Sequence, residues 1–188
     1  MMTKEKILLE SMKLFSVQGF DSVSIRTIAA AVGVTNSALY KHFSSKQAIF
    51  DALVENSKKR LLEKYCELDV MNTKVESLKD MCLRMFTFQT EDEWVTMFRR
   101  MLVIEQFKNP LMATTYREFF IDMPVQGQAK IFAIMIQAGH IKDKNPEVMA
   151  MELYAPFFLY HTIEVDKAKL EPLFCQHIDN FLEMYIKK

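Results

Sequence analysis

The stretch "SIRTIAAAVGVTNSALYKHFSSK", residues 24–46, sets short polar segments between apolar ones in a pattern typical of two short helices. Ser24 is a good N-cap for a helix over residues 25–32, and Gly33 ends that helix. Thr35 then caps a second short helix. Two short helices joined by a tight turn are the layout of a helix-turn-helix, which the sequence therefore predicts near its N-terminus.

Two further helices flank this pair. Residues 4–18 place most of their apolar side chains on one arc of a helical wheel, and Gly19 ends that helix. After the pair, Ser44 and Gln47 have the spacing of a capping box, which predicts a long helix reaching about Cys66. The first third of the chain thus predicts three short helices and one long one.

The rest of the chain also reads as helical. No run of alternating apolar residues is bounded by hairpin turns, and the chain has only 4 glycines. The expected helices cover residues 74–89, 91–108, 111–121, 125–139, 147–165 and 170–186. We expect an all-α fold with an N-terminal helix-turn-helix domain over residues 1–46 and a larger helical domain over residues 47–188. A long connecting helix over about residues 45–66 links the two.

Composition and charge indicate a protein with a substantial core and no overall attraction to nucleic acid or membranes. Half of the 188 residues are hydrophobic, which is enough for a substantial core. Lys plus Arg and Asp plus Glu both total 24, so no net charge draws the whole chain toward nucleic acid or a membrane. Residues 1–50 nevertheless carry more basic than acidic side chains. Any electrostatic attraction to nucleic acid is therefore local to the N-terminal segment.

The cysteines and the apolar runs of the sequence indicate the cellular compartment in which we expect the protein. The three cysteines, Cys66, Cys82 and Cys175, lack metal-ligand spacing, so we expect no metal site and a reducing cytoplasm. No uninterrupted apolar run approaches about 18 residues, and no basic segment leads into an apolar one at the N-terminus. We expect neither export nor a membrane span.

The second helix of a helix-turn-helix enters the major groove of DNA, and its first residues reach base edges. Small polar side chains at that position allow a close approach, and other residues contact phosphates. The candidate DNA-contacting residues are Ser24, Arg26, Thr27, Thr35, Asn36, Ser37, Ala38, Tyr40, Lys41, His42 and Lys46. The alternative is that residues 24–46 are two short helices of a bundle with a solvated polar face.

A longer pattern extends from Leu14 to Phe50. It comprises Phe15, Gly19, Phe20, Ser24, Ile25, Ile28, Ala29, Gly33, Val34, Leu39, Tyr40, His42, Phe43, Ser45 and Lys46. On these residues the chain resembles the N-terminal DNA-binding domain of the TetR family of bacterial transcriptional regulators. Ser37, where many members have glycine or alanine, and Phe50, where leucine is usual, depart from the pattern.

This resemblance implies an all-helical, two-domain homodimer that binds a partly palindromic operator in double-stranded DNA. It also implies a C-terminal domain that binds a small molecule and thereby releases the DNA. Because that domain varies greatly within the family, the resemblance supports its architecture and says little about its ligand.

The last two expected helices suit a subunit interface. Helix 147–165 is apolar nearly all round, and helix 170–186 carries one continuous apolar stripe. We expect these helices to form a four-helix bundle with their symmetry mates, as the resemblance implies. The expected interface residues are Phe158, Phe174, Ile178, Phe181 and Leu182. The alternative is that helix 147–165 is the central helix of the chain's own core.

Glu105 falls on the apolar stripe of helix 91–108. A carboxylate on such a face must be paired, protonated or bound to something. One interpretation is an ion pair with Arg117 or Arg84, and the other is a place at the polar end of an effector pocket. The abundance of methionine and aromatic residues favours a hydrophobic or amphipathic effector. The expected pocket residues are Trp94, Phe98, Met101, Glu105, Phe119, Phe120, Phe157 and His161.

Two classes of function follow. The first is a DNA-binding transcriptional regulator, expected to be a repressor that a small effector releases from its operator. The second is a helical DNA-binding or interaction protein whose larger domain only dimerises or recruits a partner. The sequence contains no glycine-rich phosphate loop, nucleophile elbow or pair of histidines one helical turn apart. We therefore expect neither enzymatic activity nor a cofactor.

Overall fold

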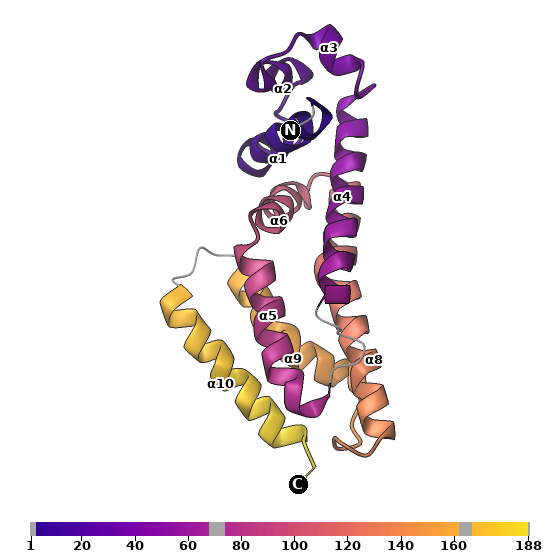
Figure 1. Cartoon of the computed structure of the whole chain (residues 1–188), viewed down its shortest axis with the longest axis vertical. Helices are drawn as coiled ribbons and strands as arrows, with labels where there is room; N and C mark the ends of the chain where they lie inside the picture. Colours follow the sequence, from indigo (N-terminus) through magenta and orange to yellow (C-terminus); the bar gives the residue numbers. More distant parts are fainter. Residues whose placement is uncertain (1–2, 68–73, 162–166, 188) are drawn as a thin grey trace. The chain divides into compact units, whose positions relative to one another are not determined.

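The computed structural model describes residues 3–67, 74–161 and 167–187, and its regular structure there is helical apart from one isolated bridge (Figure 1). This confirms the predicted all-α fold. The α-helices are α1 (Thr3–Gln18), α2 (Ile25–Val32), α3 (Asn36–Tyr40), α4 (Lys46–Glu67), α5 (Leu78–Glu91), α6 (Glu93–Glu105), α7 (Pro110–Arg117), α8 (Met123–Gln137), α9 (Pro146–His161) and α10 (Lys167–Tyr185). A short 3-10 turn, η2 (Val75–Ser77), precedes α5, and a π-helical segment, η3 (Glu118–Asp122), lies between α7 and α8.

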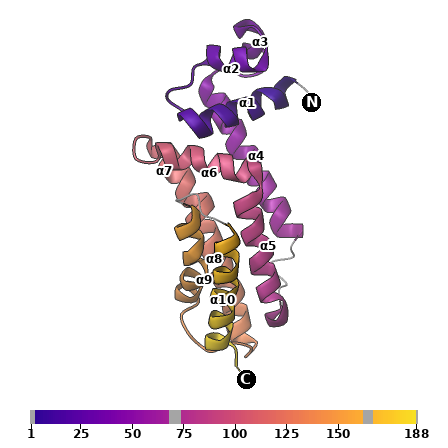
Figure 2. The ribbon, with the colours of Figure 1, turned by 90° about the vertical axis from the view of Figure 1, so that its left-hand side faces the viewer.

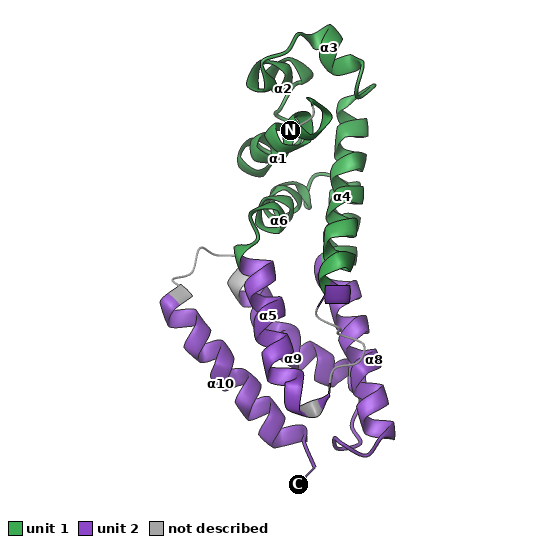
Figure 3. Ribbon diagram, in the orientation of Figure 1, with its two compact units in different colours: residues 1–64, 91–119 green, residues 65–90, 120–188 purple. Residues whose placement is uncertain are grey.

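The chain divides into two compact units (Figure 3). Unit 1 comprises residues 1–64 and 91–119, and unit 2 comprises residues 65–90 and 120–188. The division passes through α4 and η3 rather than after residue 46, because α6 and α7 pack in unit 1. The boundary that the sequence placed after residue 46 therefore does not coincide with the division between the two compact units. It stays a prediction of where the DNA-binding domain ends.

Unit 1 buries the apolar faces that the sequence pattern predicted for its first four helices. The fully buried side chains include Ile7, Met12, Phe15, Ile28, Leu39, Ile49, Phe50 and Leu53. The Phe20 ring lies edge-on to Phe15 and to Phe50, with centroid separations of 5.2 and 5.6 Å. This cluster joins α1, the turn after it and α4 into one core.

Within the same unit, α6 lies along α1, as Figures 1 and 2 show from two directions. The beginning of α6 is attached to α4 by polar contacts. Trp94 Nε1 donates to Ser57 Oγ at 2.9 Å, and Arg60 Nη2 donates to Asp92 Oδ2 at 2.7 Å. Asp92 also caps α6 by accepting from the Val95 amide. The start of α6 is thus fixed against the middle of α4.

The core of unit 2 combines aliphatic, methionine and aromatic side chains of α5, α8, α9 and α10. Phe86 stacks on Phe174 with their centroids 4.1 Å apart, and Phe157 meets both rings edge-on. A buried hydrogen bond from the Tyr154 hydroxyl to Gln89 Oε1, 3.0 Å long, adds a polar contact between α9 and α5. Within this unit α9 packs along α8 and contacts α10.

Two local expectations about helix ends were wrong. Ser45, not Ser44, caps α4, because its Oγ accepts from the Ala48 amide at 3.0 Å. The break expected between residues 121 and 125 is filled by η3, so the chain is helical from Pro110 to Gln137. That run is long and apolar enough to cross a membrane, but core helices of soluble proteins meet the same criterion of length and composition.

Candidate nucleic-acid interface

The helix-turn-helix forms as the sequence predicted. Ser24 Oγ accepts from the Thr27 amide at 3.1 Å, and Thr35 Oγ1 accepts from the Ala38 amide at 3.1 Å. Between the two helices Gly33 adopts φ 79°, and the Val34 amide donates to the Ala29 carbonyl at 2.9 Å. This pattern is a Schellman ending, in which a glycine tolerates the left-handed conformation that side chains disfavour. The turn between α2 and α3 is therefore short and fixed.

The side chains of α3 and its neighbours divide into buried ones, which support the helix, and exposed ones, which are available to contact DNA. Leu39 is fully buried and Phe43 nearly so, which anchors the helix on the core of unit 1. Most of the predicted DNA-contacting side chains are exposed around it: Ser24, Arg26, Thr27, Thr35, Asn36, Ser37, Tyr40, Lys41 and His42. Ala38 is half-buried. These exposed side chains carry hydroxyl, amide and cationic groups, which are the groups that contact phosphates and base edges.

Lys46 differs from the other predicted contacts. Its ammonium group donates to the Phe20 carbonyl at 2.7 Å and to the Asp21 carbonyl at 3.2 Å. It also lies 4.4 Å from the centre of the Phe20 ring. An ammonium group has three donors, so two of them are engaged within the protein. Lys46 holds the turn that follows α1, a role the sequence pattern did not indicate.

Two other lysines of the N-terminal segment have roles that sequence reasoning missed. Lys6 Nζ donates to the Val32 carbonyl at 2.8 Å and thereby completes the end of α2. Lys4 lies over the Phe43 ring, 5.5 Å from its centre. The excess of basic side chains in residues 1–50 was the only signal in the sequence, and it did not distinguish these structural contacts from groups available to a ligand.

The expected effector-pocket residues do not come together within either unit. Trp94, Phe98, Met101, Glu105 and Phe119 belong to unit 1, whereas Phe120 and Phe157 belong to unit 2. In unit 1 the Phe98 and Phe119 rings meet edge-on with centroids 5.5 Å apart, and Met101 is fully buried. In unit 2 Phe157 is part of the stacked aromatic core. The side chain of His161 lies outside the described residues.

Glu105 does not form the ion pair that one interpretation of the sequence suggested, and its place in an effector pocket stays a prediction. Its side chain is only 3% exposed, and Oε1 accepts from the Asp21 amide at 3.4 Å. In the described part of the chain it forms no ion pair with Arg117 or Arg84. Arg84 Nη1 instead lies 3.7 Å from Asp80 Oδ2. Oε2 has no hydrogen-bond partner among the described residues. The carboxylate faces the turn between α1 and α2.

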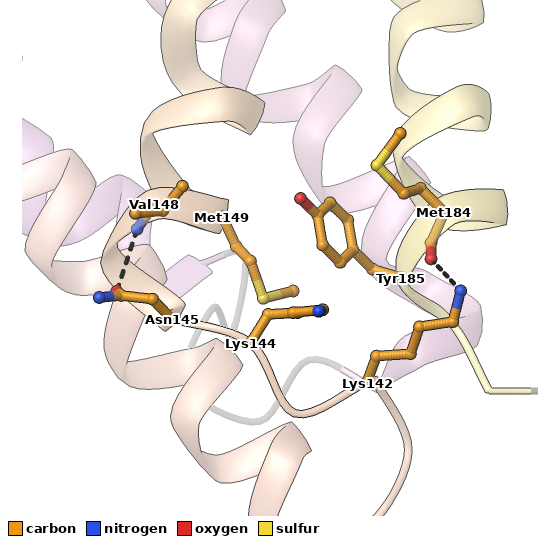
Figure 4. A pocket seen from close by; sticks show the side chains of 7 residues that line it. All are labelled: Lys142, Lys144, Asn145, Val148, Met149, Met184 and Tyr185. Carbon is orange, nitrogen blue, oxygen red and sulfur yellow. Dashed lines mark hydrogen bonds between the residues drawn. The ribbon is translucent and has the colours of Figure 1, made fainter.

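A cavity of about 380 Å³ lies elsewhere, in unit 2 (Figure 4). Its lining consists of Lys142, Lys144, Asn145, Val148, Met149, Met184 and Tyr185. Several of these polar groups already complete helix ends. Asn145 Oδ1 accepts from the amide of Glu147 at 2.9 Å, and Lys142 Nζ donates to the Met184 carbonyl at 2.6 Å. A hydrogen bond to Glu152 raises the pKa of Tyr185 above its ordinary value. Of the expected effector-binding side chains that the structure describes, none lines this cavity.

The expected interface residues on α10 point into the chain's own core. Phe174, Ile178 and Phe181 are buried in unit 2, where Phe181 stacks on Phe132 with centroids 5.4 Å apart. Phe158 and Leu182 are partly buried against the same core. The apolar stripe of α10 packs on α5 and α8 through these residues. A contact of Phe174, Ile178 and Phe181 with a second copy of the chain stays a prediction. Among the side chains of α9 and α10 that the structure describes, the large apolar ones that remain exposed are Val148, Met151, Leu159, Leu173 and Met184.

The fold and this surface define an all-helical protein with an N-terminal helix-turn-helix. The family described as "Bacterial regulatory proteins, tetR family" matches residues 7–53. The HTH-type transcriptional regulator AcrR of Shigella flexneri is 41% identical over 61 residues, which cover 32% of this chain and 28% of AcrR. UidR of Escherichia coli strain K12 is 32% identical over 65 residues, or 35% of this chain and 33% of UidR. The matched region therefore spans about a third of these relatives.

Solved structures extend the likeness to the whole fold. A putative TetR-family regulator from Mesorhizobium loti superposes with a TM-score of 0.75 at 19% identity, covering 98% of this chain and 97% of the other. SmeT, the repressor of a Stenotrophomonas maltophilia multidrug efflux pump, gives a TM-score of 0.70 at 22% identity, covering 100% and 92%. SmeT has also been solved in complex with triclosan. Residues 7–53 of this chain thus match the TetR family in sequence, and the whole chain shares the fold of these solved structures.

Proposed function

We propose that this protein is a DNA-binding transcriptional regulator in which α3 reads the major groove. The observation that carries the proposal is the division of α3 between the buried anchor Leu39 and the exposed residues Asn36, Ser37 and Tyr40. A helix held in this way can present its first turn to base edges at a fixed angle. Arg26 on α2 and Lys41 directly after α3 are exposed cations that suit the phosphate backbone.

The proposed form is a homodimer on a partly palindromic site in double-stranded DNA. The exposed apolar side chains on α9 and α10, defined above, support a second copy of the chain as the partner for this face. A two-fold dimer presents two identical helix-turn-helix units, which favours a site with two related halves. A regulator of this kind acts where bacterial DNA lies, so we place it in the cytoplasm.

The proposed mode of regulation is repression that a hydrophobic or amphipathic small molecule relieves. SmeT, which shares the fold, is described as a repressor and binds triclosan in its solved complex. The core of unit 2 is rich in methionine and aromatic side chains, which adapt readily to apolar ligands. An effector-free regulator is the second candidate, and the closely packed rings of Phe86, Phe157 and Phe174 favour it because they fill that core.

The test is selection of bound fragments from a random double-stranded DNA library, followed by a titration of the best fragment with hydrophobic compounds. We expect enrichment of a partial palindrome whose half-sites lie about one helical turn, or a multiple of it, apart. A folded dimer that enriches no palindrome would contradict the proposal. If DNA binds but no compound releases it, the effector-free candidate is favoured instead.

A further inference from the structure

The turn between α1 and α2 is held from two sides by opposite charges within unit 1. Lys46 Nζ donates to the carbonyls of Phe20 and Asp21, at 2.7 and 3.2 Å. Glu105 Oε1 accepts from the Asp21 amide at 3.4 Å. The peptide groups of Asp21 are therefore contacted by the first residue of α4 and by the last residue of α6.

Gly19 allows the carboxylate to approach this turn. It has φ +83°, and a Cβ atom built on it would lie 2.3 Å from Glu105 Oε1. Any side chain at this position would have to displace the carboxylate, and it would also occupy a backbone conformation that side chains rarely adopt. Gly19 and Glu105 therefore fit each other as a pair.

Stability alone does not account for a carboxylate at this place. Glu105 is buried, it has one long hydrogen bond, and its Oε2 has no partner among the described residues. Burying a charged group with so few partners is unfavourable, and an apolar side chain of similar volume in such a site is often neutral or stabilising. A buried polar group left unsatisfied calls for a specific explanation.

The position of the turn supplies that explanation. It leads directly into Ser24 and α2, and hence into the helix-turn-helix. At its other end α6 is attached to α4 through Trp94 and Ser57 and through Asp92 and Arg60. Because the start of α6 is fixed on α4, the position of Glu105 at the other end of α6 is also fixed relative to the turn between α1 and α2.

We infer that Glu105 is a positioning residue through which α6 sets the turn between α1 and α2, and with it the orientation of α3 for DNA. The inference rests on the proposed function, because it concerns the DNA affinity of the same helix-turn-helix. It is an alternative to the prediction that Glu105 binds the effector.

The first test measures the turn without DNA. In Glu105→Leu we expect hydrogen exchange at the Asp21 amide and along α2 to become faster, while the melting temperature stays equal or rises. Glu93→Leu is the matched control, because Glu93 lies on the same helix and is exposed. Unchanged exchange in Glu105→Leu would overturn the inference. So would faster exchange that spreads over the whole unit as the melting temperature falls, because that result indicates a structural role alone.

The second test measures DNA affinity on the selected palindrome. Glu105→Leu should bind at least about tenfold more weakly with an unchanged salt slope, because no phosphate contact is removed. Glu105→Asp keeps the charge but is too short for the turn, so it should lose affinity similarly. Glu105→Gln keeps the acceptor and should remain close to wild type. If Gln loses as much as Leu, or if Leu binds normally, the inference fails.

A double-mutant cycle with Gly19 isolates the contact between the two residues. Gly19→Ala should weaken DNA binding more in the wild type than in Glu105→Ala, because only the wild type has the clash with Oε1. The backbone strain is common to both backgrounds and cancels in the cycle. Additive effects would contradict the inference. If the wild type selects no DNA, the proposed function is wrong, while the exchange experiment still decides whether Glu105 holds the turn.

Discussion

The Lys46 ammonium lies 2.7 Å from the Phe20 carbonyl oxygen and 4.4 Å from the centre of the Phe20 ring. One side chain at the start of α4 thus makes a charge-assisted hydrogen bond and a cation–π contact to the same residue. Because Phe20 lies between Phe15 and Phe50, this pair links the polar turn after α1 to the aromatic core of unit 1.

Replacing Lys46 with methionine should lower the free energy of unfolding by about 1–2 kcal/mol, because two carbonyls lose a charged donor in a partly exposed site. Urea unfolding measures the effect. Lys41→Met is the control, since Lys41 is exposed and should change stability by less than about 0.5 kcal/mol. Equal stability of Lys46→Met and the wild type would show that these contacts contribute nothing.

Replacing Lys41 with alanine should weaken binding to all DNA sites similarly and reduce the slope of log affinity against log salt concentration by about one unit. The reason is the loss of one released counterion at a phosphate. Fluorescence anisotropy at four or more salt concentrations gives the slope. A variant with an unchanged slope, or with a new base preference, would rule out the phosphate contact.

Replacing Ser37 with alanine should change base preference instead of the salt slope. Ser37 lies exposed on the first turn of α3, where side chains reach base edges. We expect a change of about 1–3 kcal/mol in discrimination at one position of each half-site, which repeated library selection detects. The same selected sequence and affinity in both proteins would remove Ser37 from the set of reading residues.

The neighbours Leu173 and Phe174 should behave in opposite ways, because Leu173 is 58% exposed and Phe174 is 1% exposed. Leu173→Glu should dissociate the proposed dimer and leave the fold of the chain intact, which sedimentation and circular dichroism measure. Phe174→Ala should instead lower the free energy of unfolding by about 3–5 kcal/mol through loss of core packing. A Leu173→Glu variant that remains dimeric would place the interface elsewhere.

The cysteines should differ in reactivity. Burial raises the pKa of the Cys82 thiol to about 12, whereas Cys66 is exposed. Between pH 7 and 9 Cys82 therefore stays a thiol in the folded protein, and alkylation followed by mass spectrometry should label Cys66 well before Cys82. The pKa of the Cys82 thiol is higher in the folded protein than in the unfolded one. The free energy of unfolding should therefore fall as the pH rises from 9 toward 12, because the unfolded protein loses this proton first. Equal labelling of both cysteines at pH 8 would contradict the burial.

The sequence by itself determined the elements whose signals are local. Ser24 and Thr35 cap α2 and α3 through amides three residues away, and Gly33 ends α2 through its own backbone conformation. These interactions involve neighbours along the chain, so residue type and spacing were sufficient to predict them. The TetR resemblance over residues 14–50 came from the same local signals.

Only the tertiary structure decided what the interior side chains contact. The stripe of α10 was recognised as apolar, but whether it faces a partner or the chain's own core depends on which helices pack against it. Glu105 was recognised as a carboxylate on an apolar face, yet its partner Asp21 lies 84 positions away in the sequence. Periodicity shows that a face must be covered and leaves open which distant segment covers it, because that choice depends on how all the helices pack together.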